Sequence, residues 1–428
     1  MMSDSPAEQQ GLHLMAKPVG PICNLDCDYC FYLEKEDMYP PREKFRMSDE
    51  VLRAYVQGYI AAQPTPEVEF TWQGGEPTLL GVEFFQRAVR YQREYAGSKT
   101  IRNSLQTNGT LLDEQWCQFL AAEDFTVGIS IDGPQAIHDL HRPDKQGRSS
   151  FDSVMTGLQL LRQHRVQFNV LVTVSRQSTA HGLEIYRFLK AAGGRFIQFN
   201  PVVERLPTPA EQVLQLHFAQ PPGLSLEPPS ALAELPASAA AVSPQSVERE
   251  AYGDFLIAVF DEWVRNDVGT VHVMNFEWAL ASWLQLPASV CLFSPRCGKA
   301  LIVEHSGEVY SCDHFMYPDY RLGNIAEDDL QTLASSAAQQ AFGAAKQTTL
   351  PAYCQRCPYL FACHGECPKN RFTRTPDGEV GLNYLCPSYK KYFAHITEAM
   401  NALGQIVSQG FAASTIMDAY KGPLLLKH

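Results

Sequence analysis

The stretch PVGPICNLDCDYCFYLEKE, residues 18–36, decides how the rest of the chain is interpreted. Its three cysteines, Cys23, Cys27 and Cys30, stand at C-x3-C-x2-C spacing, and Tyr29 precedes the last of them. A closed structural zinc site has four ligands and usually carries its cysteines in C-x2-C pairs, so zinc would need a distant histidine here. Three thiolates on one loop instead fit a cubane [4Fe-4S] cluster whose fourth iron stays open to a small molecule.

The bulk composition excludes several classes of protein. The chain has 428 residues and a net charge of -12, with no clustered Lys and Arg, so we expect no nucleic-acid partner. The first residues lack a basic and apolar signal pattern, and no segment approaches about 18 uninterrupted apolar residues, so we expect neither export nor a membrane. Its 12 cysteines then belong in a reducing cytoplasm, where metal or redox chemistry is commoner than disulfides.

Between residues 12 and 200, short β-rich runs alternate with helical patterns, which is typical of β/α units on a parallel sheet. Six units are too few to close an eight-stranded barrel, so we predict an α/β fold with an incomplete (β/α)6 barrel. The expected strands are residues 12–17, 67–72, 101–106, 125–131, 166–174 and 195–200. Helices are expected to begin near Ser48, Gly81, Asp113, Phe151 and Thr179.

The loops after the first four predicted strands carry the unusual residues. The cysteine loop follows the first strand, QGGEP (73–77) the second, TNG (107–109) the third and DGP (132–134) the fourth. Carboxyl ends of parallel strands meet at one rim of such a barrel, where active sites are built. We therefore expect these four loops to converge.

The remaining composition divides the chain into further segments. Pro, Ala and Ser dominate residues 205–248, which follow neither the helical nor the strand period and indicate an insertion or linker without function. The predicted division is a disordered arm (1–13), the partial barrel (14–204), that insertion (205–248), bridging helices (249–290), a cysteine-rich domain (291–387), and a C-terminal helix and tail (388–428).

A second group of cysteines lies in the cysteine-rich segment. Eight thiolates satisfy two fully ligated [4Fe-4S] clusters, and two zinc sites with four cysteines each would satisfy the same count. Cys117 stands apart in the helical pattern DEQWCQFLAAE and is expected to be a small buried core residue. The eight cysteines are Cys291, Cys297, Cys312, Cys354, Cys357, Cys363, Cys367 and Cys386.

The cysteine loop after the first strand resembles that of the radical S-adenosylmethionine superfamily. The resemblance implies that the open iron binds S-adenosylmethionine and that an electron from the cluster releases a 5'-deoxyadenosyl radical. It also implies several cofactor contacts: the methionyl amino group at the GGEP motif, ribose or another polar edge at the fourth strand, the carboxylate at an arginine, and adenine after the sixth strand. The implied residues are Tyr29, Gly74, Gly75, Glu76, Ser130, Asp132, Arg142 and Val203.

Two of these residues have plainer alternatives. Asp132 could form an Asx turn with Gly133, and this would be compatible with cofactor binding. Arg142, in HDLHRP, carries a guanidinium fork that matches a carboxylate, but a surface ion pair would use the same fork.

The cysteine-rich segment resembles the SPASM extension, and the chain from Leu14 to about Met400 resembles the anaerobic sulfatase-maturating enzymes. The resemblance implies two auxiliary [4Fe-4S] clusters, making three in all, with Cys367 reaching back to the inner one. A simpler local grouping would place Cys354, Cys357, Cys363 and Cys367 together, so spacing alone leaves the partition open. The implied inner set is Cys291, Cys297, Cys312 and Cys367, and the outer set is Cys354, Cys357, Cys363 and Cys386.

Asp313 follows Cys312 directly and matches the general base of that family. Once a hydrogen atom has left the substrate Cβ, forming an aldehyde requires loss of the thiol or hydroxyl proton together with one more electron; a carboxylate beside a cluster supplies an acceptor for each. A solvated loop aspartate is the plainer alternative, and His314 competes for the same task.

The resemblance implies an oxidoreductase that converts a Cys or Ser residue of an unfolded sulfatase polypeptide to Cα-formylglycine. The implied target motif is Cys or Ser followed by x-Pro-x-Arg, and the implied electron donor is a flavodoxin or ferredoxin. Two other functions stay open: another SPASM-type peptide maturase, for example one that forms thioethers, and a zinc-stabilised binding scaffold.

Overall fold

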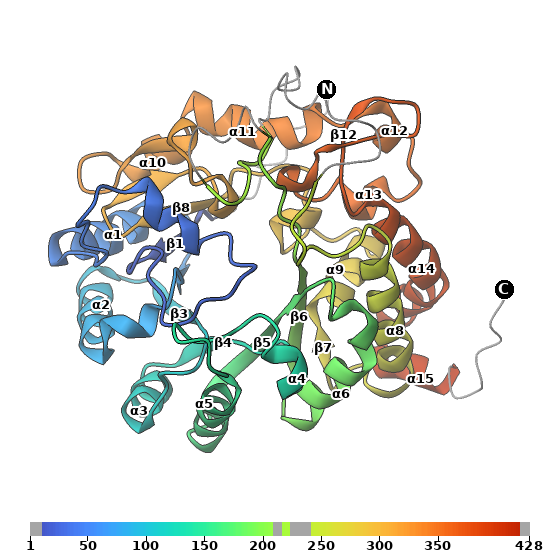
Figure 1. The fold of residues 1–428 in the computed structure, drawn as a ribbon, viewed down its shortest axis with the longest axis horizontal. Coiled ribbons are helices and arrows are strands. Elements are labelled where there is room, and N and C mark those ends of the chain that lie inside the picture. The colour runs from blue at the N-terminus through green and yellow to red at the C-terminus, as the bar shows by residue number, and fades with distance from the viewer. Residues whose placement is uncertain (1–10, 209–215, 223–240, 420–428) are drawn as a thin grey trace.

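The computed structural model describes residues 11–208, 216–222 and 241–419 (Figure 1). Six parallel strands, paired in chain order, form the predicted incomplete barrel. Figure 1 shows them as an open arc, with the connecting helices on its outer side. The strands are β1 (His13–Lys17), β2 (Glu67–Trp72), β3 (Thr100–Thr107), β4 (Phe125–Ser130), β5 (Gln167–Val174) and β6 (Phe196–Pro201).

The connecting helices begin where the sequence predicts. The side chains of Ser48 and Asp113 accept hydrogen bonds from the backbone N–H groups of Val51 and Trp116, which caps the first turns of α1 and α3. Thr179 opens a 3-10 helix, η3 (Thr179–His181), that leads into α6. The helices are α1 (Asp49–Ala62), α2 (Val82–Tyr95), α3 (Glu114–Ala122), α4 (Gln135–His138), α5 (Phe151–Gln163) and α6 (Gly182–Ala191).

The two faces of the barrel sheet differ in polarity. Phe70 and Trp72 are fully buried and pack edge-on against Tyr55 of α1, and Trp72 also packs on Phe85 of α2. The alternating residues face the other way, toward the interior of the arc, and include half-exposed Thr71. Polar pairs such as Gln106 Nε2 to Ser130 Oγ, at 3.0 Å, lie on that face. The interior of the barrel is therefore polar and accessible.

The sheet extends beyond the six predicted strands. At one edge β7 (His272–Val273) pairs in parallel with β6, and at the other β8 (Ala300–Glu304) pairs in parallel with β1. Antiparallel β9 (Glu308–Tyr310) and β10 (Arg321–Asn324) complete a ten-stranded sheet. These strands are short, so periodicity did not reveal them, yet they join the cysteine-rich segment to the barrel by backbone hydrogen bonds.

The C-terminal part packs around a long helix. α14 begins at Cys386 and ends at Ser408, within two residues of the predicted start of the C-terminal helix at 388, with Pro387 in its first turn. Its neighbours are α8 (Ala251–Asn266), α9 (Met274–Trp283) and α15 (Ile416–Ala419). The remaining elements are α10 (Leu330–Ala334), α11 (Ala337–Thr348), α12 (Ala352–Gln355), α13 (Leu360–Cys363), β11 (Thr373–Arg374) and β12 (Val380–Leu382).

Two predicted segments fall largely outside the described residues. The predicted N-terminal arm includes residues 1–10, which are outside, but His13 already belongs to β1. Of the predicted insertion, residues 209–215 and 223–240 are outside, while Arg205 bridges Val242 and Val247 is fully buried. No helix within the described ranges has the length and apolar character needed to cross a membrane.

Candidate active site

The three-cysteine loop leaves the carboxyl end of β1, with Cys23, Cys27 and Cys30 half-buried. Burial raises the pKa of Cys23 to about 11, and burial also raises the pKa values of Cys27 and Cys30. The Cys23 Sγ atom accepts from the Leu25 backbone N–H at 3.4 Å and from Asn108 Nδ2 at 3.7 Å. Thiols in this state bind metal by releasing protons, and their number and spacing fit three irons of a cubane cluster.

The GGEP loop lies directly against the cysteine loop. The backbone N–H of Gly75 donates to Gly20 O at 2.8 Å, and that of Glu76 donates to Ile22 O at 2.9 Å. A Cβ atom at Gly75 would lie 2.0 Å from the Ile22 carbonyl oxygen, so only glycine permits this contact. The glycine is required by the approach of two loops, a reason that the sequence did not reveal.

Glu76 organises the loop from a fully buried position. Its Oε1 accepts from Thr78 N, Thr78 Oγ1 and Thr107 Oγ1, and its Oε2 accepts from Asn108 N. Three of these donors go to Oε1 and one goes to Oε2, so Oε2 keeps an accepting position, and burial raises the pKa of Glu76 despite the four bonds. The bond from Glu76 to the methionyl amino group stays a prediction.

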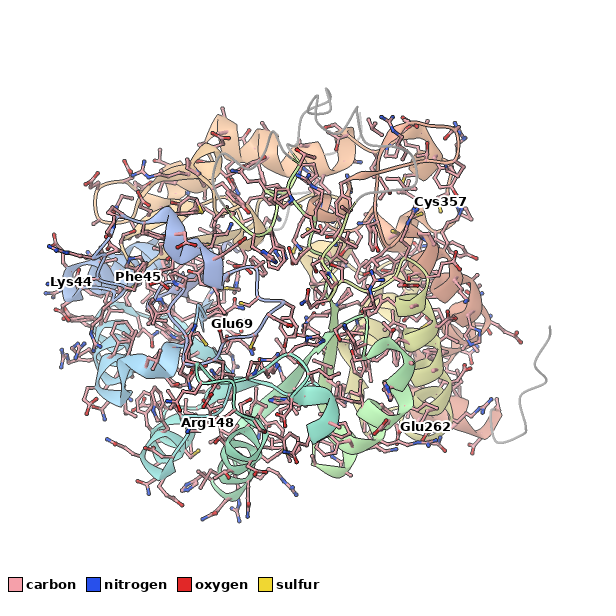
Figure 2. All side chains as sticks on the ribbon, viewed as in Figure 1. Lys44, Phe45, Glu69, Arg148, Glu262 and Cys357 are labelled. Carbon is pink, nitrogen blue, oxygen red and sulfur yellow. The ribbon has the colours of Figure 1, made fainter. Side chains whose placement is uncertain are left out.

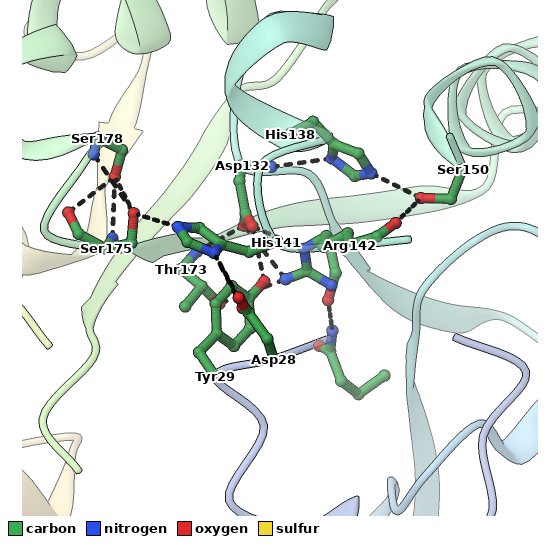
Figure 3. A network of polar contacts seen from close by, with 12 residues as sticks. Asp28, Tyr29, Asp132, His138, His141, Arg142, Ser150, Thr173, Ser175 and Ser178 are labelled. Atoms are coloured by element: carbon green, nitrogen blue, oxygen red, sulfur yellow. Dashed lines mark hydrogen bonds and ion pairs between the residues drawn. The ribbon is translucent and has the colours of Figure 1, made fainter. Parts of the chain in front are cut away.

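Asp132, Arg142 and Tyr29 form one buried network (Figure 3). Arg142 Nε donates to Asp132 Oδ2 at 2.7 Å, and its Nη2 donates to Asp132 Oδ1 at 3.2 Å. Tyr29 Oη donates to Asp132 Oδ2 at 2.7 Å, which ties the cysteine loop to the end of β4. Burial acts to raise the pKa of Asp132, but the guanidinium outweighs it and holds the pKa below its usual range.

This network bears on two predicted cofactor contacts. The surface ion pair weighed for Arg142 is excluded, because Arg142 and Asp132 are 7% and 3% exposed. The Arg142 guanidinium and the Asp132 carboxylate are hydrogen-bonded to each other through two contacts, and their contacts to a cofactor stay predictions. Removing one partner of a buried ion pair leaves the other charge uncompensated, which is strongly destabilising. The pair therefore holds Asp132 and Arg142 in fixed positions at the rim of the barrel.

His141 and His138 complete the rim and were missed in the sequence. His141 Nδ1 lies 2.9 Å from Asp28 Oδ1 on the cysteine loop, and His141 Nε2 lies 3.0 Å from Ser175 Oγ after β5 (Figure 3). His138 Nδ1 lies 3.4 Å from the Asp132 backbone N. Two histidines in HDLHRP were a signal for this role, because each ring has two hydrogen-bonding nitrogens.

Ser130 and Val203 occupy different environments. Ser130 is half-buried on the barrel interior, where its Oγ accepts from Gln106, and it stays a candidate for a polar cofactor contact. Val203 is 2% exposed within the main core, and its carbonyl oxygen accepts from Lys369. Its contact with adenine stays a prediction. Cys117 is fully buried in the same core, as predicted.

Asp313 is brought to the barrel by the strands that the sequence did not reveal. Its Oδ1 lies 2.7 Å from Nζ of Lys17 at the end of β1, and 23% of its side chain is exposed. Burial acts to raise the pKa of Asp313, but the Lys17 ammonium outweighs it and holds the pKa below its usual range. Asp313 is therefore an ionised carboxylate that a substrate can reach.

Several cations surround Asp313. Lys17 also lies over the Tyr32 ring at 4.0 Å, and Lys369 Nζ binds Glu204 Oε1 at 2.7 Å. Burial, followed by the charge of Lys369, lowers the pKa of His314 to about 4, so this imidazole is neutral near pH 7. No sequence motif marked Lys17 or Lys369 as site residues. The one signal for Lys17 was its position as a charged residue at the end of an apolar strand.

The eight cysteines of the second group gather in two places. Cys354, Cys357, Cys363 and Cys386 line one cavity, whose walls include Tyr353, Tyr389 and Phe393. Figure 2 shows Cys357 at the outer corner of the molecule, near α12 and α13. Burial raises the pKa values of Cys367 and Cys312. The thiolates of Cys291 and Cys297 raise that of Cys367 further, and those of Cys367 and Cys291 do the same for Cys312, so these four cysteines lie near one another. Four thiolates in each set match the ligands of one fully ligated [4Fe-4S] cluster.

The arrangement defines a radical S-adenosylmethionine oxidoreductase with an auxiliary iron–sulfur domain. Residues 18–189 match the radical SAM superfamily, and residues 291–358 match the SPASM iron-sulfur cluster-binding domain. A serine-type anaerobic sulfatase-maturating enzyme of Bacteroides thetaiotaomicron is 42% identical over 96% of this chain and 95% of its own. The chain belongs to the family of anaerobic sulfatase-maturating enzymes.

Solved structures agree with this assignment. The enzyme anSMEcpe with bound AdoMet and the Cp18Cys peptide is 30% identical, with a TM-score of 0.78 over 92% of this chain and 99% of that one. A cysteine-type sulfatase-maturating enzyme of Clostridium perfringens is 32% identical over 90% of this chain and 96% of its own. SuiB of Streptococcus suis, bound to its precursor peptide, is 12% identical with a TM-score of 0.56, which shows a shared fold alone. Sulfatase maturation is thus favoured over other peptide modifications.

Proposed function

We propose that this enzyme generates Cα-formylglycine in the cytoplasm by oxidising a Cys or Ser in a C/S-x-P-x-R segment of an unfolded sulfatase. The observation that carries this proposal is the reachable Asp313 carboxylate beside the barrel that bears the cysteine loop. A net charge of -12 favours a substrate segment containing arginine. A flavodoxin or ferredoxin provides the first electron.

S-adenosylmethionine and the cluster on Cys23, Cys27 and Cys30, when bound, supply the abstraction of a hydrogen atom from the substrate Cβ. Converting CH2OH to CHO removes two protons and two electrons: one of each leaves as the abstracted hydrogen atom, the hydroxyl proton needs an acceptor, and the remaining electron would pass to an auxiliary cluster. Asp313 accepts the hydroxyl proton, and Lys17 keeps the Asp313 carboxylate ionised beforehand. A Cys target would give a thioaldehyde, which water hydrolyses to the aldehyde with release of sulfide. Tyr29 and the Asp132–Arg142 pair hold the rim in place.

We propose the same division of the eight cysteines between two auxiliary sites as the resemblance implied. The shared cavity supports the outer set of Cys354, Cys357, Cys363 and Cys386. The mutual charge effects among Cys367, Cys291, Cys297 and Cys312 support the inner set. The local grouping of Cys367 with Cys354, Cys357 and Cys363 is disfavoured, because Cys386 occupies the fourth place in their cavity.

Serine is the proposed natural target. The chain is 42% identical to a serine-type enzyme but 32% identical to a cysteine-type enzyme over similar lengths. Both peptides are therefore tested side by side, with serine expected to give the higher aldehyde yield.

The test is anaerobic incubation with S-adenosylmethionine, a low-potential reductant and a peptide containing S-x-P-x-R, C-x-P-x-R or A-x-P-x-R, followed by mass spectrometry. Aldehyde is expected from the first two peptides and none from the alanine control. Cofactor cleavage without aldehyde on either peptide would refute sulfatase maturation. Zinc in place of iron and acid-labile sulfide would refute the whole chemistry.

A further inference from the structure

Arg371 lies between the two auxiliary cysteine sets. Its side chain is buried, with Nε donating to Gly365 O at 3.0 Å and Nη2 donating to His364 O at 2.9 Å and Glu366 O at 3.3 Å. These three residues separate Cys363 of the outer set from Cys367 of the inner set. The guanidinium is thus hydrogen-bonded to the three-residue connection between Cys363 and Cys367, which belong to different sets.

The connection itself is a tight turn shaped around Arg371. His364, Gly365 and Glu366 all have positive φ, at 46°, 73° and 50°, which is a costly run for residues other than glycine. A Cβ atom at Gly365 would lie 2.6 Å from Arg371 Nη2. The turn therefore brings backbone carbonyls and guanidinium together at close quarters.

The positive charge of Arg371 is buried, and its donors bond backbone carbonyl oxygens. Its remaining donor, Nη1, bonds Lys346 O at 2.6 Å, and within the described ranges its hydrogen bonds go to carbonyl oxygens rather than to a carboxylate. A guanidinium does not deprotonate in proteins, so the charge is constant across pH. Burial lowers the pKa of Arg371, whereas the thiolates of Cys367 and Cys297 of one set and Cys354 and Cys363 of the other act to raise it, so the guanidinium lies within electrostatic range of both sets.

Two lysines differ from Arg371 because each faces one set. Lys346 is fully buried, and its Nζ donates to Cys291 O at 2.6 Å and Leu292 O at 2.8 Å, beside the inner set. Lys390 is half-buried, lines the cavity of the outer set, and donates to Tyr353 Oη at 2.8 Å. The chain thus offers a cation for each set and one shared cation.

We propose that Arg371 raises the reduction potentials of both auxiliary clusters, whereas Lys346 raises that of the inner cluster alone and Lys390 that of the outer one. The proposal depends on the cluster assignment of the proposed function. Reducing a [4Fe-4S] cluster adds one negative charge, and a nearby cation stabilises the reduced form, most strongly where water is excluded. Arg371 is a positioning residue that makes both clusters better electron acceptors.

The test measures potentials in full-length, anaerobically prepared protein in which Cys23, Cys27 and Cys30 are replaced by Ala, so that only auxiliary clusters contribute. Redox titration followed by electron paramagnetic resonance is compared for R371Q, K346Q and K390Q, with iron and sulfide counted in each. R371Q is expected to shift both midpoint potentials to more negative values. K346Q is expected to shift one and K390Q the other, the latter by less because water screens Lys390.

R371K separates charge from hydrogen bonding. It keeps the charge but loses the fork, so both potentials are expected to stay near those of the parent, whereas a shift equal to that of R371Q would overturn the proposal. Unchanged potentials in R371Q with about eight irons retained would also overturn it. If R371Q loses a cluster, the midpoint potentials of K346Q and K390Q decide the question. The proposal fails if both variants shift the potential of the same cluster, or if neither shifts any potential.

This outcome is distinct from that of the proposed function. Potentials are read without peptide or S-adenosylmethionine, so shifted potentials with no aldehyde in the peptide assay would sustain the role of Arg371 and refute sulfatase maturation. Aldehyde formation with potentials unmoved would do the reverse.

Discussion

The cysteine loop and the auxiliary sets collect their thiols in opposite ways. Cys23, Cys27 and Cys30 lie within eight residues of one loop, whereas the outer set joins residues as far apart as Cys354 and Cys386. The loop faces an accessible barrel interior, and the outer set is walled by aromatic rings. The site that must admit a ligand takes its thiols from one short segment, whereas each auxiliary set takes its thiols from segments far apart in the sequence.

Removing a cysteine from the loop is expected to have the largest effect. Cys27→Ala should abolish S-adenosylmethionine cleavage and remove about four of about twelve irons, because only this cluster has an open iron. Iron analysis and chromatography of the cleavage products measure both. Cys117→Ala is the matched control: it alters a buried barrel cysteine and should leave iron content unchanged. Full cleavage by C27A would dismiss the loop as the cofactor site.

Double variants of the second group test how its thiols divide. C312A/C367A removes two ligands of the inner set and should cost about four irons, whereas C363A/C367A strikes both sets and should cost about eight. The local grouping predicts the reverse, because it places Cys363 and Cys367 together. Iron and sulfide counts on anaerobic protein decide between the two partitions.

Asp313→Asn tests the chemistry that lies between the two regions. The amide cannot accept the substrate proton, so aldehyde yield should fall by ~10²- to 10⁴-fold while S-adenosylmethionine cleavage continues. His314→Ala is the control, because it removes the neighbouring imidazole and leaves the Asp313–Lys17 ion pair in place. Equal aldehyde yield from D313N would remove Asp313 from the role of base.

The smallest predicted effect is a displaced pH profile. The pKa of Asp313 is held below its usual range of about 4, so aldehyde formation should lose its base only at strongly acid pH. Lys17→Met removes the charge that lowers this pKa, so the acid limb of the rate profile should move to higher pH. Rates of aldehyde formation across pH for both proteins measure the shift, and an unmoved limb would contradict the pairing.

The barrel was predictable because its strands and caps obey local rules. Phe70 and Trp72 alternate with polar residues, and Ser48 and Asp113 cap the helices that follow. The roles of single polar residues were less accessible. Glu76 and Arg142 were predicted from motifs to meet a ligand, yet both are engaged within the chain, because buried charges need partners that lie far away in sequence.

The pairing of β8 with β1 also escaped sequence reasoning, since Ala300–Glu304 is a short apolar run far from its partner. The role of Lys17 escaped with it, because that lysine finds Asp313 only after the two strands have paired. Family resemblance supplied Asp313 as a base, but not the cation that keeps it ionised.

This pairing has a further consequence for how the polypeptide can be divided. A fragment that stopped before Ala300 would leave the N–H and C=O groups of β1 bare along one side, a template onto which other chains can stack. The barrel and the cysteine-rich domain thus share one continuous sheet through the β1–β8 pairing, and either part expressed alone should aggregate.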